Sequence, residues 1–478
     1  MMTQAQRSEL RAQRKHERFP IPDSRFPMSS RFTIHASRFT TSLAALALLL
    51  APVLGEAQGT IVIRGGTVVP VTGARIPNGT VVIQNGRITA VGAGAQAPAG
   101  ATEINATGMF VYPGLINAGT NMGLLEMGGV PGPVDTREVG DFNPQNIATS
   151  AVNVGSEHIG VTRANGITSV ITVQGGSVLS GLAGLINLAG YTNEEMIAKE
   201  KVALLLSWPS AGGGGGGRRG GGGGGRGFGG GAPGVDPMAA YQNSVRQIYR
   251  WFAEAKAYGD VKDKLTANGA KPPVGWHQNL RYDAMIPAVR GQMPIMVDAN
   301  SVAQMRDVIK FMDSLKVKVI IHGASEGWQF ADSLAARQIP VIMDGVTGVP
   351  GNDDPYDLVY SNPGVLQKAG VQVAWATGGA SSARDLPYEV GLAEAYGFDP
   401  EEALKSITIN PARMFGVDKD YGSIEVGKVA NLIVTTGDPI DIRSQIKEVI
   451  VKGRRMQFDD RHTRFYEQYR ARPKPPGK

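Results

Sequence analysis

Residues 317–343 read VKVIIHGASEGWQFADSLAARQIPVIM, and this stretch decides the fold. Apolar runs at 317–321 and 340–343 predict two buried strands, and the segment 327–337 between them predicts a helix. Strands that are apolar on both faces and are separated by helices indicate parallel strand–helix–strand units. The stretch therefore predicts one unit of an α/β protein with a parallel sheet.

The same pattern extends along the middle of the chain. Further candidate strands lie at 109–116, 167–173, 202–207, 294–297 and 371–375, and helix-like segments lie at 301–315 and 401–407. The segment 185–188 is the candidate for the eighth strand. About eight such units predict a closed (β/α)8 TIM-like barrel.

Both ends of the chain are rich in β-formers. Asn85-Gly86 joins two β-branched runs and predicts a hairpin, and short β-runs recur at 431–435 and 447–451. We therefore expect a small β-sandwich domain built from both chain ends. The expected organisation is an N-terminal extension with a signal peptide at 1–57, the N-terminal segment of the β-sandwich at 58–110, the barrel at 111–415, the C-terminal segment of the β-sandwich at 416–456, and a basic tail at 457–478.

The N-terminal extension predicts export. Arg31 and Arg38 precede an apolar stretch at 43–54, which is typical of a signal peptide. About a dozen residues are too few to span the ~30 Å hydrocarbon core, although an uncleaved anchor is the alternative. We expect a secreted or periplasmic protein without a membrane span after signal removal. Translation could start at Met1 or at Met28.

Composition narrows the classes of function. The absence of Cys excludes disulfides, Cys-ligated zinc and a thiol nucleophile. The net charge is +6, but residues 1–57 hold eight Lys/Arg against four Asp/Glu, which leaves 40 against 38 for the rest. A near-neutral body with basic appendages does not favour nucleic-acid binding. The Gly-rich run at 211–234 predicts a flexible insertion that offers no side chains to a core.

Several motifs, in a fixed order, carry a family resemblance. The sequence reads YPGLINA at 112–118, GASEGW at 323–328, DLPYEVGLA at 385–393, INPAR at 409–413 and GSIEVGK at 422–428. These motifs resemble the amidohydrolase superfamily, particularly its imidazolonepropionase-like and prolidase-like branch. With the β-rich opening segment, the resemblance covers nearly all of residues 60–456.

The resemblance implies one or two divalent metals at the C-terminal mouth of the barrel. The family's ligands are a His-X-His on strand 1, often a Lys or Glu on strand 4, one His each on strands 5 and 6, and an Asp on strand 8. Imidazole and carboxylate suit zinc, and the metal supplies hydroxide for hydrolysis of amide or other carbon–nitrogen bonds.

Most of these ligand positions hold unsuited residues. The strand 1 motif is Gly119-Thr120-Asn121, the strand 5 position is Asp298, and the strand 8 base position is Gly378, whereas strand 6 keeps His322. Only three other His residues follow residue 57, namely His158, His277 and His462, and no two residues form a His-X-His pair.

Three interpretations remain open. The first is a non-hydrolytic or impaired relative, which would bind a small-molecule or peptide-like ligand at a pocket that includes Asn121, Asp344 and Thr377. It could also assemble with itself or with an active paralogue. The second is a hydrolase with a rebuilt site, in which zinc or another divalent metal binds His322 and Asp298, with Asp344 as a third ligand.

The third interpretation is a polyanion or cell-surface binding module, and it depends on the Arg-bearing Gly-rich run and the basic tail. Nucleophilic catalysis by Ser325, Ser381 or Ser382 is disfavoured. The Gly-X-Ser-X-Gly motif is absent around Ser381 and Ser382, and no His lies close in sequence to these two residues; Ser325 does lie in such a motif, at 323–327, and is expected to be a loop residue.

Overall fold

The computed structural model describes residues 59–128, 130, 132, 134–210, 236–268, 275–348, 354–458 and 460–473. The expected signal peptide at 1–57 and the expected Gly-rich insertion at 211–234 lie outside these residues. Among the helices that are described, none is both long enough and apolar enough to cross a bilayer.

Eight strands form a nearly closed barrel sheet, which confirms the predicted TIM-like barrel. The strands follow one another round the sheet in chain order, and β13 meets β6 through a parallel bridge between Gly378 and Thr120. The barrel strands are β6 (Leu115–Thr120), β7 (Ile167–Thr172), β8 (Leu179–Asn187), β9 (Ile197–Ser207), β10 (Ile295–Ala299), β11 (Val319–Gly323), β12 (Val341–Asp344) and β13 (Val373–Ala376).

One strand departs from the expected parallel arrangement. β8 runs antiparallel to both β7 and β9, whereas the other barrel pairs are parallel. The expectation of uniformly parallel units was wrong here because the connections on both sides of β8 are short. A short connection allows an antiparallel neighbour, whereas a parallel neighbour needs a crossover of a dozen residues or more.

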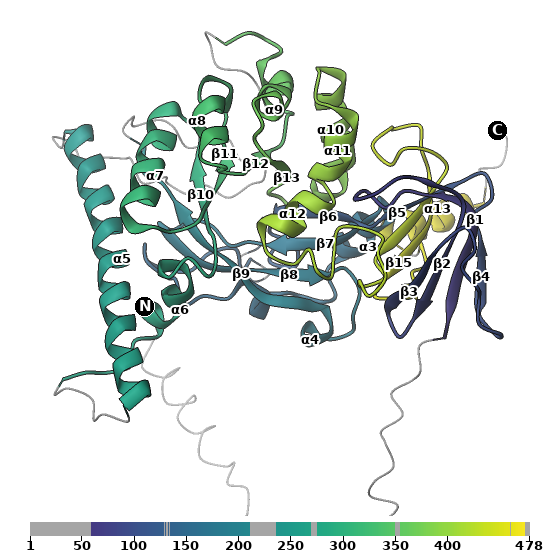
Figure 1. Ribbon diagram of the computed structural model, residues 1–478, viewed down its shortest axis with the longest axis horizontal. Helices are drawn as coiled ribbons and strands as arrows, with labels where there is room; N and C mark the ends of the chain where they lie inside the picture. Colours follow the sequence, from purple (N-terminus) through teal and green to yellow (C-terminus); the bar gives the residue numbers. More distant parts are fainter. Residues whose placement is uncertain are drawn as a thin grey trace, which may run out of the picture. The chain divides into compact units, whose positions relative to one another are not determined.

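Helices flank the later strands. Figure 1 shows α7, α8, α9 and α10 in a row beside β10, β11, β12 and β13. The helices are α3 (Glu157–Ala164), α4 (Asn193–Met196), α5 (Pro237–Asn268), α6 (Leu280–Val289), α7 (Val302–Leu315), α8 (Ala331–Ala336), α9 (Leu358–Lys368), α10 (Leu386–Ala395), α11 (Pro400–Ser406), α12 (Ile409–Met414) and α13 (Arg461–Arg470). Short 3-10 turns are η1 (Ala148–Ala151), η2 (Gly327–Gln329) and η3 (Ala383–Asp385).

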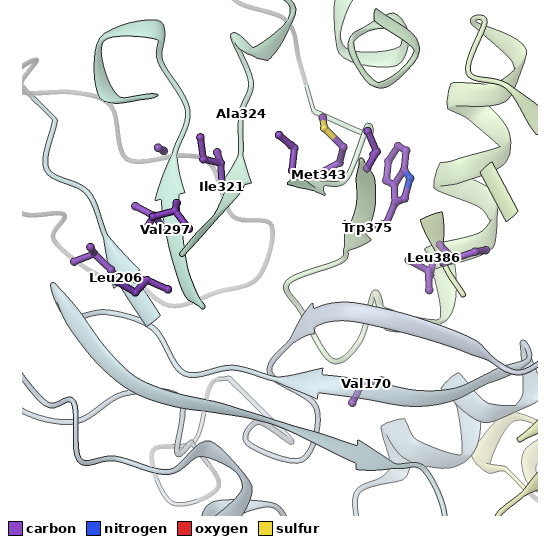
Figure 2. Close-up of a cluster of buried hydrophobic side chains, with 14 of the residues drawn as sticks. Val170, Leu206, Val297, Ile321, Ala324, Met343, Trp375 and Leu386 are labelled. Carbon is purple, nitrogen blue, oxygen red and sulfur yellow. The ribbon is translucent and has the colours of Figure 1, made fainter. Parts of the chain in front are cut away.

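Alternate residues of each barrel strand enter two different cores. Met296 and Ile320 pack inside the barrel, whereas their neighbours Val297 and Ile321 belong to the layer between the strands and the helices. Figure 2 shows this outer layer, in which Trp375 is fully buried. This two-sided burial is the reason why the strands read as continuous apolar runs in the sequence.

A second sheet is built from both ends of the chain, as predicted. Its order is β16-β15-β14-β5-β1-β2-β3, with β4 paired to β1. The strands are β1 (Ile61–Val68), β2 (Ile76–Gln84), β3 (Arg87–Gly92), β4 (Thr102–Asn105), β5 (Phe110–Pro113), β14 (Leu432–Thr435), β15 (Ile446–Val451) and β16 (Arg454–Arg455). The predicted single strand at 109–116 is therefore two strands, β5 in this sheet and β6 in the barrel, separated at Gly114.

A buried polar network joins the second sheet to the barrel. Asn431 Nδ2 donates to Ser169 Oγ at 2.9 Å and to Asn187 Oδ1 at 2.8 Å. Asn187 Nδ2 in turn donates to the Tyr421 hydroxyl at 3.1 Å. Buried amides need such partners, so the network fixes how β14 meets β7 and β8.

Substitution of Gly184 tests how closely the antiparallel strand β8 packs against its neighbours. A Cβ at this position would lie 2.3 Å from Thr149 Cγ2 and 2.4 Å from the Glu200 carbonyl oxygen of β9. We expect Gly184→Ala to lower the free energy of unfolding by about 1–3 kcal/mol through overpacking, measured by urea denaturation. The matched control is Gly94→Ala, because a Cβ at Gly94 meets nothing within 4 Å. Equal stability of the two variants would contradict this packing.

Candidate functional site

The predicted site residues lie at the carboxyl ends of neighbouring barrel strands. Asp298 is near the end of β10, His322 near the end of β11, and Asp344 ends β12. Asp298 and His322 are direct register partners. The strands therefore place all three side chains at the C-terminal mouth, where barrel enzymes carry their active sites.

Asp298 and His322 form a tight hydrogen-bonded pair. His322 Nδ1 is 2.5 Å from Asp298 Oδ1, and Ser207 Oγ donates to Asp298 Oδ2 at 2.9 Å. With Asp298 ionised, the carboxylate only accepts, and Nδ1 is then the donor. The imidazole is almost fully buried, with 7% of its side chain exposed. The structure thus brings the two predicted ligands together, with Asp298 positioned to orient the ring.

Asp344 lies on the opposite side of the imidazole. Its Oδ1 is 3.9 Å from His322 Nε2. Because Asp298 contacts Nδ1, the two carboxylates face different nitrogens of one ring. A ligand or proton at Nε2 would therefore meet Asp344 and not Asp298.

A small cavity opens beside the Asp298–His322 pair. Its volume is about 20 Å³, which is enough for one water molecule. Its polar lining residues are Gln174, Ser180, Ser207, Asp298 and His322. Ser207 is not among the predicted site residues, although it ends a predicted strand and is the register partner of Asp298. The expected pocket residues Asn121, Asp344 and Thr377 do not line this cavity.

Gly119, the first of the two ligand positions expected on strand 1, is packed against other side chains of the barrel. A Cβ at Gly119 would lie 3.1 Å from Ala376 Cβ and 3.4 Å from Met296 Cε. Gly119 therefore faces the barrel interior, as a ligand would, but the Met296 side chain occupies the space beside it. Met fills irregular gaps well because it is unbranched and flexible.

The other family positions join the seam that closes the barrel. Asn121 Oδ1 accepts from the Ala380 backbone N–H at 2.6 Å, and the Asn121 N–H donates to the Gly378 carbonyl at 2.8 Å. Gly378 has a φ of +65°, where an Asp would be strained. Thr377 Oγ1 accepts from Asn117 Nδ2 at 2.7 Å. Asn121, Thr377 and Gly378 thus hold β6 against β13.

The donor set does not fit the family's metal site. Within the described ranges, no group of three or more His, Cys, Asp or Glu side chains is placed to hold a metal ion. A catalytic zinc needs three protein ligands besides water, whereas in the described part of the chain His322 Nε2 and Asp344 Oδ1 form a pair of potential ligands 3.9 Å apart. Binding of a single metal to His322 and Asp298 stays a prediction.

A further acidic side chain lies beside the mouth. Glu389 belongs to α10, which follows the last barrel strand, and only 8% of the residue is exposed. Burial raises the pKa of Glu389 to about 7, with smaller contributions from the charges of Asp344 and Asp385. Sequence reasoning missed this residue; its signal was a carboxylate in the otherwise apolar helix start LPYEVGLA.

The remaining candidates lie elsewhere or have structural partners. His158 is on α3, His277 is exposed before α6, and His462 is exposed on α13. Ser325 Oγ donates to Asn300 Oδ1 at 2.9 Å, and Ser382 Oγ donates to the carbonyls of its own loop. None of these contacts forms a Ser–His pair.

The raised pKa of Glu389 predicts a pH-dependent stability. The unfolded carboxyl titrates near its ordinary value of 4.5 and the folded one at about 7. Stability from this group is thus fully present below pH 4.5 and is lost as pH rises through 7. We expect the difference in unfolding free energy between Glu389→Gln and wild type to grow by on the order of 2–3 kcal/mol between pH 4 and pH 8, measured by urea denaturation. A difference that is constant with pH would contradict the shift.

The chain is similar to several known proteins. It is 38% identical over 82 residues to an imidazolonepropionase from Pseudomonas fluorescens, which covers 16% of this chain and 20% of that protein. It is 24% identical over 426 residues to an adenine deaminase from Paracoccus denitrificans, which covers 86% of this chain and 60% of that protein. The alignments thus span less than two thirds of these relatives.

The fold has a close structural counterpart. The crystal structure of an amidohydrolase from Thermotoga maritima superposes with a TM-score of 0.70 at 23% identity, covering 83% of this chain and 99% of that one. The Amidohydrolase family profile matches residues 362–456, from α9 to the end of the second sheet. The chain is thus similar to the amidohydrolase family in the segment 362–456 and shares the barrel fold of the Thermotoga maritima protein.

Proposed function

We propose that this protein is an exported amidohydrolase relative that does not carry out metal-dependent hydrolysis of amide or other carbon–nitrogen bonds. It uses the barrel mouth to bind a small-molecule or peptide-like ligand. The observation that carries the proposal is the closure of the strand 1 ligand positions: Met296 packs beside Gly119, and Asn121 is hydrogen-bonded to the Ala380 backbone.

The large effect that a bound metal has on the pKa of water supports this proposal. A bound metal lowers the pKa of water from about 15.7 to about 7. Without it, the hydroxide available near neutral pH falls by roughly eight orders of magnitude. The position of the family's general base is Gly378, which has no side chain to move a proton. An intact barrel with such a mouth suits binding better than this hydrolysis.

Export and assembly complete the proposal. The charged and apolar pattern at 31–57 supports a secreted or periplasmic location. The protein assembles with a second copy of itself or with an active paralogue. Nucleic acid is not a proposed partner, because residues 58–478 are nearly neutral.

A second candidate function is hydrolysis with a single metal on His322. It is favoured by the 3.9 Å separation of His322 Nε2 and Asp344 Oδ1. A tetrahedral zinc holds such atoms roughly 3.3 Å apart, given zinc–ligand bonds of about 2.0–2.1 Å. A small movement would allow it, with Asp298 orienting the imidazole in the way carboxylates orient ligating histidines.

Metal content separates the two candidates. We expect the purified mature protein to contain far less than one zinc, manganese or iron per chain by elemental analysis, and its melting temperature to be unchanged by a chelator. His322→Ala should leave the metal content at the same low level. One tightly bound metal per chain that is lost in His322→Ala would instead establish the single-metal hydrolase.

Substitution of Asn121 tests whether this residue stabilises the barrel seam or binds a metal. We expect Asn121→Ala to lower the free energy of unfolding by about 1–3 kcal/mol, because it leaves the Ala380 N–H without its acceptor. Asn105→Ala is the matched control, since Asn105 Oδ1 accepts the Thr107 N–H at 3.0 Å in an exposed turn and should cost less. Both variants are compared by urea denaturation. Loss of bound metal with unchanged stability in Asn121→Ala would contradict the structural role.

A further inference from the structure

Three carboxyl groups beside the barrel mouth interact electrostatically. Asp344 ends β12, Asp385 ends η3, and Glu389 lies one turn further on α10. The charges of Asp344 and Asp385 both act on the Glu389 carboxyl. Asp344 keeps about a third of its side chain exposed, so a ligand entering the mouth can reach it.

One oxygen of the Glu389 carboxyl has an unmet need for a hydrogen bond. Its Oε2 is buried and accepts no hydrogen bond from the described residues. An unsatisfied buried polar atom costs about 1–3 kcal/mol, and native structures satisfy most such atoms. A donor from outside the chain would remove this cost.

Two glycines lie next to the oxygens of these carboxyls. A Cβ at Gly345 would lie 3.0 Å from Glu389 Oε2, and a Cβ at Gly378 would lie 3.5 Å from Asp344 Oδ1. Both glycines have positive φ, +62° and +65°, so other residues are strained there. The Glu389 oxygen therefore lies against the turn that follows Asp344, where a side chain at position 345 would press on it.

We propose that Asp344 and Glu389 bind the ammonium or amidinium group of a small organic cation at the barrel mouth. This inference rests on the proposed ligand-binding function and names its substrate class. A charged N–H group donates to both carboxyls, and such charge-assisted hydrogen bonds are roughly twice as strong as neutral ones. An anionic ligand would meet like charges instead.

The local charge supports a cation. Arg384 Nε is 3.6 Å from Asp385 Oδ1 and partly offsets that carboxylate at the surface. Burial and the two neighbouring acids raise the pKa of Glu389 to about 7. A bound cation would favour the ionised form of Glu389, which the unliganded site disfavours.

The test compares three probes of similar shape and different charge. Benzylamine, benzyl alcohol and benzoate are titrated into the full-length mature protein at pH 7.5 and followed by calorimetry, with methylamine and benzamidine as further cations. We expect at least one cation to bind, and benzylamine to bind at least about tenfold more tightly than benzyl alcohol or benzoate, because about 1.4 kcal/mol of charge interaction corresponds to that factor.

Variants then locate the binding. Asp344→Asn and Glu389→Gln should each weaken the bound cation by about tenfold, with circular dichroism to check the fold. Glu394→Gln is the matched control, since it removes a carboxyl from the same helix, and the acids that act on Glu394 are Asp438, Asp399 and Asp441. It should leave affinity within about twofold of wild type.

The results that would overturn the cation site differ from the result that would overturn the proposed function. Absence of binding by all three cations, or wild-type affinity in both Asp344→Asn and Glu389→Gln, overturns the cation site. Binding of benzoate or benzyl alcohol as tightly as benzylamine also overturns it, while leaving the proposed ligand-binding function in place. One tightly bound metal per chain would overturn the proposed function itself.

Discussion

The structure depends on the seam that closes the barrel between β6 and β13. The Asn121 N–H donates to the Gly378 carbonyl, and the Gly378 N–H donates to the Gly119 carbonyl at 3.0 Å. Asn121 Oδ1 fixes the following loop through Ala380. By the resemblance in sequence, these are the positions at which ligands on strands 1 and 8 were expected. In this chain, hydrogen bonds at these positions connect the first and last strands. The two glycines of the seam also shape the barrel mouth. Met296 packs beside Gly119 inside the barrel, and Asp344 from the neighbouring strand β12 lies beside Gly378.

The fold could be predicted further than the site. The eight barrel strands are detectable because burial on both faces makes each one an apolar run. The Asn85-Gly86 pair separately predicts a hairpin in the second sheet. The antiparallel direction of β8 was not detectable, since an apolar run has no direction and only the short connections around it decide the pairing. The division of 109–116 at Gly114 was hidden because both halves are apolar.

The sequence predicted only those site residues that lie at the ends of apolar strands. His322, Asp298 and Asp344 are visible because each closes an apolar run, and the barrel then brings their ends together. The hydrogen bond that commits Asp298 to His322 Nδ1 depends on side-chain rotamers, which no sequence pattern encodes. Glu389 is separated from Asp344 by 45 positions in the chain, so their mutual effect appears only after folding.

The charge of the mouth argues for a positive partner. The charge of Asp344 acts on Glu389, and the described residues leave one oxygen of Glu389 without a hydrogen bond. Acids that repel each other are stabilised by a balancing positive charge. Near neutral pH a proton shared with Glu389 supplies part of the balance, as its raised pKa indicates. A cationic ligand would supply the rest while satisfying the oxygen, which a proton on the other carboxyl oxygen cannot do.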